Sequence, residues 1–81
     1  MNLTIDWKDA HYGSERGYVN GLELVSVGYG TVRQERMYYL ETSLPFRSAL
    51  LGQKYATADD AKHAALLYVA RILNRLNGGA S

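Results

Sequence analysis

Residues 57–76, TADDAKHAALLYVARILNRL, have the pattern of a single amphipathic helix. Thr57 is a good N-cap residue, and Asp60 follows three residues later in a capping-box-like position. Asp59 and Asp60 also place negative charge where the helix dipole favours it. At about 100° per residue, one broad apolar face collects Ala61, Ala65, Tyr68, Val69, Ile72, Leu73 and Leu76. The pattern predicts a helix over residues 58–76 whose apolar face needs a partner surface.

The end of this helix is marked as clearly as its start. Arg71 and Arg75 place cations in the last turns, and Asn77-Gly78-Gly79 can leave the helix through a left-handed residue. Leu67 and Arg71 fall in one column nearly opposite the apolar face. We therefore expect Leu67 to project into solvent beside a cationic side chain.

The first segment of the partner sheet is predicted at residues 3–8. Leu3, Ile5 and Trp7 alternate there with polar residues, which is typical of a strand with one apolar face. Trp7 is expected to anchor the sheet to the helix. Residues 9–17 hold two glycines and several charged or titratable groups, so we expect a loop.

The second strand is predicted over residues 18–29, and its centre is ambiguous. The adjacent pair Leu24-Val25 interrupts strict alternation, which a bulge near Asn20-Gly21 would explain. The same Asn-Gly dipeptide also suits a two-residue hairpin turn, which would divide the segment into two strands. The bulge or turn-entry interpretation is preferred.

The third strand is predicted over residues 33–42, where Tyr38 and Tyr39 must point to opposite faces. Residues 43–54 have no clear period and contain a proline and a glycine, so we expect a loop that carries apolar side chains over an open core edge. The predicted fold class is α+β. A three-stranded antiparallel sheet is packed on one face by a C-terminal α-helix, in the order β-β-β-α and within one domain, residues 1–81.

Composition limits the functional classes. The 81 residues are 47% hydrophobic with one proline, no cysteine and a formal charge of +1, which indicates a small folded domain without disulfides. No run approaches the roughly 20 apolar residues of a membrane span, and the N-terminus lacks the pattern of a signal peptide. We expect a cytoplasmic protein. The near-balance of charge argues against a DNA mimic and against a non-specific nucleic-acid binder.

The residues that could carry chemistry are few. His11, Ser14 and Glu15 share one loop, but residues so close in sequence seldom form a preorganised nucleophile, base and acid. His63 near the helix start predicts a surface pair with an aspartate rather than a metal site, because no cysteine or carboxylate cluster accompanies it. We therefore expect no catalytic residue, cofactor or metal, and the protein is predicted not to be an enzyme.

A family resemblance adds to this interpretation. The early Trp7, the Tyr38-Tyr39-Leu40 strand, and GQKYAT (residues 52–57) followed by ADDAKHAA (residues 58–65) resemble small phage and prophage proteins of β-β-β-α build. That resemblance implies an accessory factor that modulates or blocks host machinery, for example a defence complex of the CRISPR type. The architecture also resembles the arm-type DNA-binding domain of phage integrases, although the dense Lys and Arg decoration of that sheet face is missing.

Two surfaces are candidates for binding a partner. On the sheet, Tyr39, Arg33 and Arg36 are expected to share or border the uncovered face, together with Tyr29 or Tyr18. Tyrosine with arginine suits both protein interfaces and base stacking on single strands. On the helix, Leu67 and Arg71 form the rival surface.

The predicted function is non-enzymatic binding and inhibition of a host protein or protein complex. The alternative is a small DNA-binding module that uses its sheet face. A monomer is expected, or a homodimer joined through a free strand edge or through Leu67.

Overall fold

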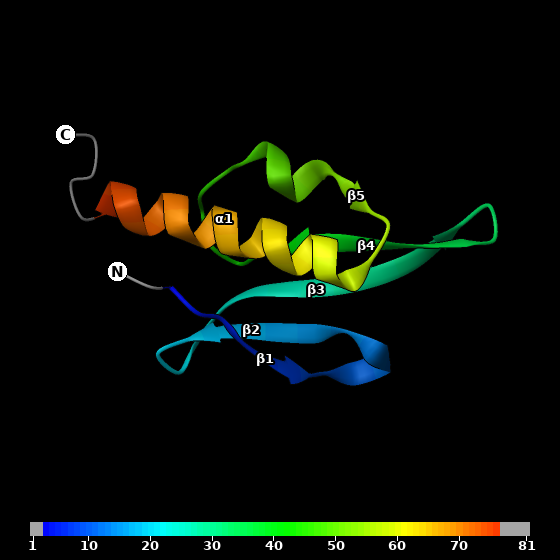
Figure 1. The fold of residues 1–81 in the computed structure, drawn as a ribbon, viewed down its shortest axis with the longest axis horizontal. Helices are drawn as coiled ribbons and strands as arrows, with labels where there is room; N and C mark the ends of the chain where they lie inside the picture. Colours follow the sequence, from blue (N-terminus) through cyan, green and yellow to red (C-terminus); the bar gives the residue numbers. More distant parts are fainter. Residues whose placement is uncertain (1–2, 77–81) are drawn as a thin grey trace.

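The computed structural model describes residues 3–76 and consists of one helix on one face of an antiparallel sheet (Figure 1). Helix α1 spans Ala58–Leu76, as the sequence pattern predicts. The Thr57 hydroxyl oxygen accepts a hydrogen bond from the Asp60 backbone N–H at 3.1 Å, which is the expected N-cap. The predicted turn at Asn77-Gly78-Gly79 lies outside the described residues.

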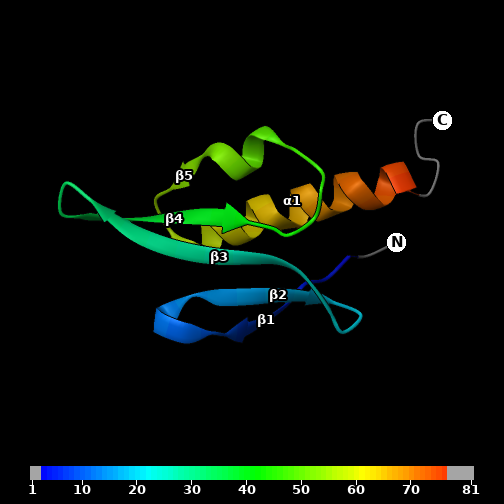
Figure 2. The same ribbon diagram turned by 180° about the vertical axis from the view of Figure 1, so that it is seen from behind.

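Small side chains let α1 lie close to the sheet. Its buried residues are Ala61, Ala64, Ala65, Tyr68, Val69 and Ile72. The predicted apolar face extends further than the buried one, because Leu76 is 65% exposed. The C-terminal end of α1 runs past the sheet (Figures 1 and 2).

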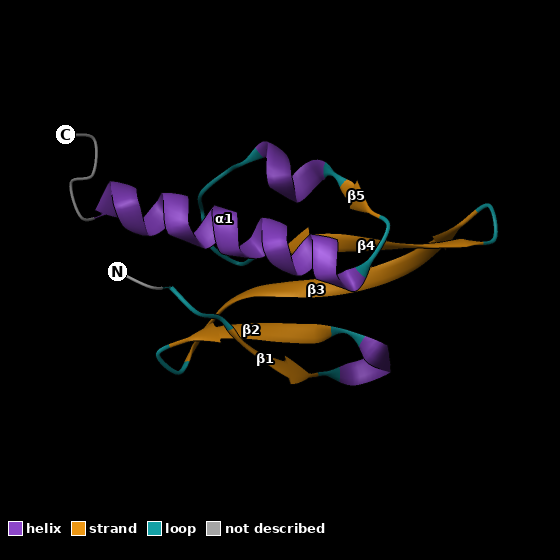
Figure 3. Ribbon diagram, in the orientation of Figure 1, coloured by secondary structure: helices purple, strands orange, loops and turns teal. Residues whose placement is uncertain are grey.

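The sheet has five strands, which corrects the predicted three. The strands are β1 (Asp6–Asp9), β2 (Glu15–Val19), β3 (Leu22–Val32), β4 (Glu35–Glu41) and β5 (Lys54–Tyr55). Their order in the sheet follows the chain, and every neighbouring pair is antiparallel (Figure 3). The fold class is therefore α+β as predicted, with a larger sheet.

One extra strand arises because residues 18–29 form parts of two strands. Asn20 and Gly21 have φ angles of 52° and 80°, so they form the two-residue hairpin turn that joins β2 to β3. The preferred interpretation of a single bulged strand was wrong on this point. A register shift does occur nearby, between Gly17 and Tyr18.

Strand β2 also takes residues from the segment expected to be a loop. Gly17 is buried inside it, and a Cβ atom there would lie 2.7 Å from Ile5 Cγ2 and 2.8 Å from Val25 Cγ2. The glycine therefore serves close packing rather than a turn. The connection between β1 and β2 is shorter than expected and contains the 3-10 turn η1 (His11–Gly13).

The segment after β4 is more regular than the predicted loop. It contains the 3-10 helix η2 (Ala49–Gly52) and then β5, which pairs with β4. The Tyr55 hydroxyl donates a hydrogen bond to the Leu50 carbonyl at 2.7 Å, and burial raises the pKa of this phenol above its ordinary value. The apolar residues of the segment pack against the core as expected: Leu44, Phe46, Leu50 and Leu51.

The core lies between α1 and one face of the sheet. Its buried sheet-side residues are Ile5, Val25, Val27 and Leu40. Trp7 is partly buried and packs against the edge of this core. The Lys62 ammonium of α1 lies 5.6 Å from the centroid of the Trp7 ring. In the part of the chain that the structure describes, no helix covers the opposite face of the sheet (Figures 1 and 2).

Candidate binding surface

The β3–β4 hairpin projects beyond the N-terminal end of α1 (Figures 1 and 2). Strand β2 pairs with β3 only as far as Val27, and β5 pairs with β4 only at Tyr38 and Tyr39. Residues 28–37, named here the hairpin arm, therefore pair only within the β3–β4 hairpin. Arg33 and Gln34 form its two-residue turn, with φ angles of 52° and 68°. The arm is accessible on both faces and at its tip.

Tyr29 and Arg36 lie on the same face of the arm as the helix. The Arg36 guanidinium carbon is 4.6 Å from the centroid of the Tyr29 ring, which is a cation–π distance. Tyr29 also pairs across the strands with Tyr38, and the two ring centroids are 6.2 Å apart. Tyr29 is 38% exposed, so the arm presents an arginine stacked on a partly exposed aromatic surface.

The η1 turn extends this surface. Gly13 lies against Tyr29, since a Cβ atom on the glycine would be 3.0 Å from Tyr29 Cε1. The preceding residue, Tyr12, is 90% exposed and has a left-handed backbone with a φ of 59°. The Ser14 hydroxyl donates to the His11 carbonyl at 2.8 Å and closes the turn. We name Tyr12, Tyr29, Arg36 and Tyr38 the aromatic patch.

The predicted sheet-side residues do not form one surface. Tyr39 stands opposite Gly28 on the uncovered face, and its ring lies over Gly30 at 3.3 Å from the position of a Cβ atom. Arg36 stands on the other face, and Arg33 is exposed at the tip of the arm. The expectation of a shared face was wrong, because positions 36 and 39 of one strand differ by an odd number. The binding role of these three residues stays a prediction.

The helix-side candidates lie apart from the arm. Leu67 is 41% exposed, as expected for the side of α1 away from the core. Arg71 lies one turn further along and lines a groove between α1 and the loop before η2. Leu67 and Arg71 are therefore neighbours on the helix, and neither belongs to the aromatic patch.

The loop residues considered for catalysis have other partners. The Ser14 hydroxyl donates to the His11 backbone carbonyl rather than to its imidazole, and the Glu15 carboxylate pairs with Lys62 at 2.7 Å. Among residues 3–76 there is no group of three or more His, Cys, Asp or Glu side chains that could hold a metal ion. The Ser14 and Glu15 side chains therefore make contacts within the fold.

The chain matches no protein-family model, and neither a curated protein nor a solved structure is significantly similar to it. The resemblance to small phage proteins therefore stays a prediction. Over residues 3–76, no helix has both the length and the apolar character needed to cross a membrane.

Sequence reasoning missed Tyr12 and placed Tyr29 only as a neighbour of the uncovered face. The signal for Tyr12 was weak, because one aromatic residue in a segment expected to be a loop indicates neither its exposure nor its neighbours. The signal for Tyr29 was stronger. Once Arg33 and Gln34 are placed in a two-residue turn, Tyr29 is opposite Tyr38 and close to Arg36 on one face.

Proposed function

We propose that this protein acts without catalysis, by binding a host protein and modulating or inhibiting it, as expected for a phage or mobile-element accessory factor. The observation that supports this proposal is the aromatic patch, where Tyr29 contacts both Arg36 and Tyr38, and the turn that carries Tyr12 lies against the Tyr29 ring. Tyrosine and arginine are the residues that most often carry binding energy at protein interfaces. Such an interface needs roughly 800 Å² per partner, which a chain of this size can supply.

The conformation of Tyr12 adds weight to the proposal. A left-handed backbone is unfavourable for a residue with a Cβ atom, by about 1 kcal/mol or more. At 90% exposure, the Tyr12 side chain gains little from packing within the protein that could offset this cost. Uncompensated strain of this kind clusters at functional sites, which supports a role for the ring in contact with a partner.

A DNA-binding module remains the second candidate, because an uncovered sheet face is the surface that such a module uses. The uncovered sheet face of this protein carries charges of both signs, however. Arg16 forms an ion pair with Glu23 at 3.3 Å, and strand alternation adds Glu35 and Glu41 to the same face. A phosphate backbone favours a face with clear positive excess. The charges on this sheet therefore favour a protein partner.

The test is affinity capture from bacterial lysate with the tagged protein, with and without nuclease. The wild type is compared with Tyr12→Ala/Arg36→Ala, and with Tyr18→Ala/Lys54→Ala on the uncovered face as a control that also loses one tyrosine and one cation. We expect one stoichiometric protein that resists nuclease, is lost with the patch variant and is kept by the control. Capture that disappears with nuclease and with the control variant would favour the DNA-binding module.

A further inference from the structure

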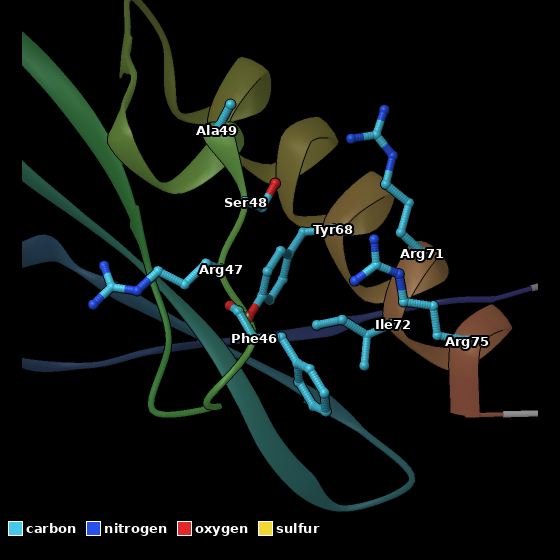
Figure 4. A pocket seen from close by; sticks show the side chains of 8 residues that line it. All are labelled: Phe46, Arg47, Ser48, Ala49, Tyr68, Arg71, Ile72 and Arg75. Carbon is cyan, nitrogen blue, oxygen red and sulfur yellow. Dashed lines mark hydrogen bonds between the residues drawn. The ribbon is translucent and has the colours of Figure 1, made fainter.

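A second surface lies at the C-terminal half of α1, away from the hairpin arm. A groove of about 240 Å³ runs between the helix and the loop before η2 (Figure 4). The Tyr68 hydroxyl donates a hydrogen bond to the Phe46 carbonyl at 2.8 Å and ties this loop to the helix. Phe46 and Ile72 supply apolar surface to the groove, and Ser48 adds a hydroxyl. The groove is therefore a preformed feature of the fold.

Three arginines border this groove. Arg71 and Arg75 extend from the helix on one side, and Arg47 extends from the loop on the other side, pointing away from them (Figure 4). Within residues 3–76, none of the three forms an ion pair with a carboxylate. The sequence has no Asp or Glu over residues 42–58 or 61–81, so nothing in these segments neutralises the arginines. Three cations therefore border the apolar surface of the groove, with no carboxylate on the segments that carry them.

We propose that this groove binds an acidic peptide segment that carries one apolar side chain. The apolar side chain occupies the space over Phe46 and Ile72, and flanking carboxylates pair with the guanidinium groups on both sides. A volume of about 240 Å³ fits a side chain or two, and it is below the size of typical cofactor sites. The site goes beyond the function proposed for the aromatic patch, because it lies on another surface and needs no shared partner.

The same features argue against a nucleic acid in the groove. Tyr68 is 1% exposed, so of the two aromatic rings that line the groove only Phe46 could stack against a base. The positive charge is also not continued along the molecule, since Asp59 and Asp60 occupy the start of α1. A strand of nucleic acid needs a continuous basic track, whereas a short acidic peptide needs only the local cluster.

The experiment measures fluorescence anisotropy with a short labelled peptide of Asp and Glu residues around one central Leu. Three related probes are a peptide with the Leu replaced by Gly, a peptide with the acids replaced by Gln, and a labelled oligothymidine. The proteins are the wild type, Arg71→Gln/Arg75→Gln, and Lys8→Gln/Lys54→Gln, which removes two cations outside the groove. Circular dichroism establishes that each variant is folded, and Arg47→Gln serves as an independent variant on the loop.

The wild type is expected to bind the acidic Leu peptide. The affinity of Arg71→Gln/Arg75→Gln for this peptide should be about tenfold lower, and Arg47→Gln should show a smaller loss. The control variant should stay within about twofold, and the Gly and Gln peptides should bind more weakly. Three results would overturn the proposal: no binding by the wild type at low salt, equal loss in the control variant, or tighter binding of oligothymidine that displaces the peptide. Because the aromatic patch is unaltered in these variants, capture of a host protein through that patch is judged separately.

Discussion

The guanidinium carbon of Arg36 lies 4.6 Å from the ring centroid of Tyr29, and this contact fixes the direction in which the arginine leaves the hairpin arm. A cation–π contact at an exposed site contributes only about 0.5–1 kcal/mol, which is small beside the stability of a domain. Its main effect is to hold the guanidinium over the ring. A partner that binds there meets an arginine whose rotamer freedom is already reduced.

A double-mutant cycle at these two residues tests that interpretation. Tyr29→Leu and Arg36→Gln are each expected to lower the free energy of unfolding by less than about 1 kcal/mol, with a coupling of about 0.5 kcal/mol. Partner affinity should fall by more than stability does, by about 1–3 kcal/mol for each variant. Urea unfolding and binding titrations measure the two quantities. Equal losses in both would mean that the pair serves the fold alone.

The glycines give a second prediction, because three of them differ in what a methyl group would meet. Gly17→Ala should lower the free energy of unfolding by about 1–3 kcal/mol, since the new Cβ would lie 2.7 Å from Ile5 Cγ2. Gly21→Ala should cost about 1 kcal/mol from its φ of 80° alone, because nothing lies within 4 Å. Gly52 has neither a positive φ nor a close neighbour, so Gly52→Ala is the near-neutral control. Urea denaturation of the three variants orders them, and a similar cost for all three would contradict the packing argument.

Tyr55 gives a prediction on pH. Burial raises the pKa of its phenol above 10.0, so the folded state holds this proton at a pH where the unfolded state releases it. The stabilisation is therefore fully present below about pH 10 and is lost as the pH rises through the folded-state pKa. Tyr55→Phe should show a shallower loss of stability above pH 10, measured by urea unfolding at a series of pH values. The variant also loses the hydrogen bond to Leu50, so the slope with pH, not the absolute stability, is the readout.

The helix and the fold class could be predicted from the sequence because their determinants are local. Thr57 and the spacing of apolar residues through Ile72 define α1 without knowledge of the rest of the chain. The extra strands could not be predicted with the same certainty. Strand β2 depends on Gly17 fitting beneath Ile5, and the two-residue β5 exists only because the edge of β4 is free to pair.

The candidate sites also combine features that could be predicted from the sequence with features that depend on the tertiary structure. Strand alternation alone separates Arg36 from Tyr39, and it could have been applied to the sequence. The neighbourhood of Tyr12 could not, since it depends on the η1 turn folding so that Gly13 lies against Tyr29. The groove is also a tertiary feature, because the loop that carries Arg47 is held beside α1 by the hydrogen bond between Tyr68 and Phe46.

That hydrogen bond gives a further stability prediction, which distinguishes an effect on the groove from a general effect on the core. Tyr68→Phe keeps the buried ring but leaves the Phe46 carbonyl without its donor, which should cost about 1–1.5 kcal/mol. Binding of the acidic peptide should weaken in the same variant, because the loop that carries Arg47 is no longer tied to α1. Leu66→Ala, a partly buried helix position away from the groove, should destabilise the fold without a specific effect on the peptide.

Tyr12 provides the sharpest test of the aromatic patch, because fold and function make opposite demands on it. Its φ of 59° suits asparagine better than tyrosine, so Tyr12→Asn should raise the free energy of unfolding by up to about 1 kcal/mol. The same change removes a ring that is 90% exposed, and capture of the partner should fall. Tyr12→Phe keeps both the ring and the strain, so it should resemble the wild type in stability and retain most of the binding. Urea denaturation and affinity capture, run in parallel on the three proteins, measure both effects. A Tyr12→Asn variant that is more stable and still binds fully would mean that the strained tyrosine has no part in recognition.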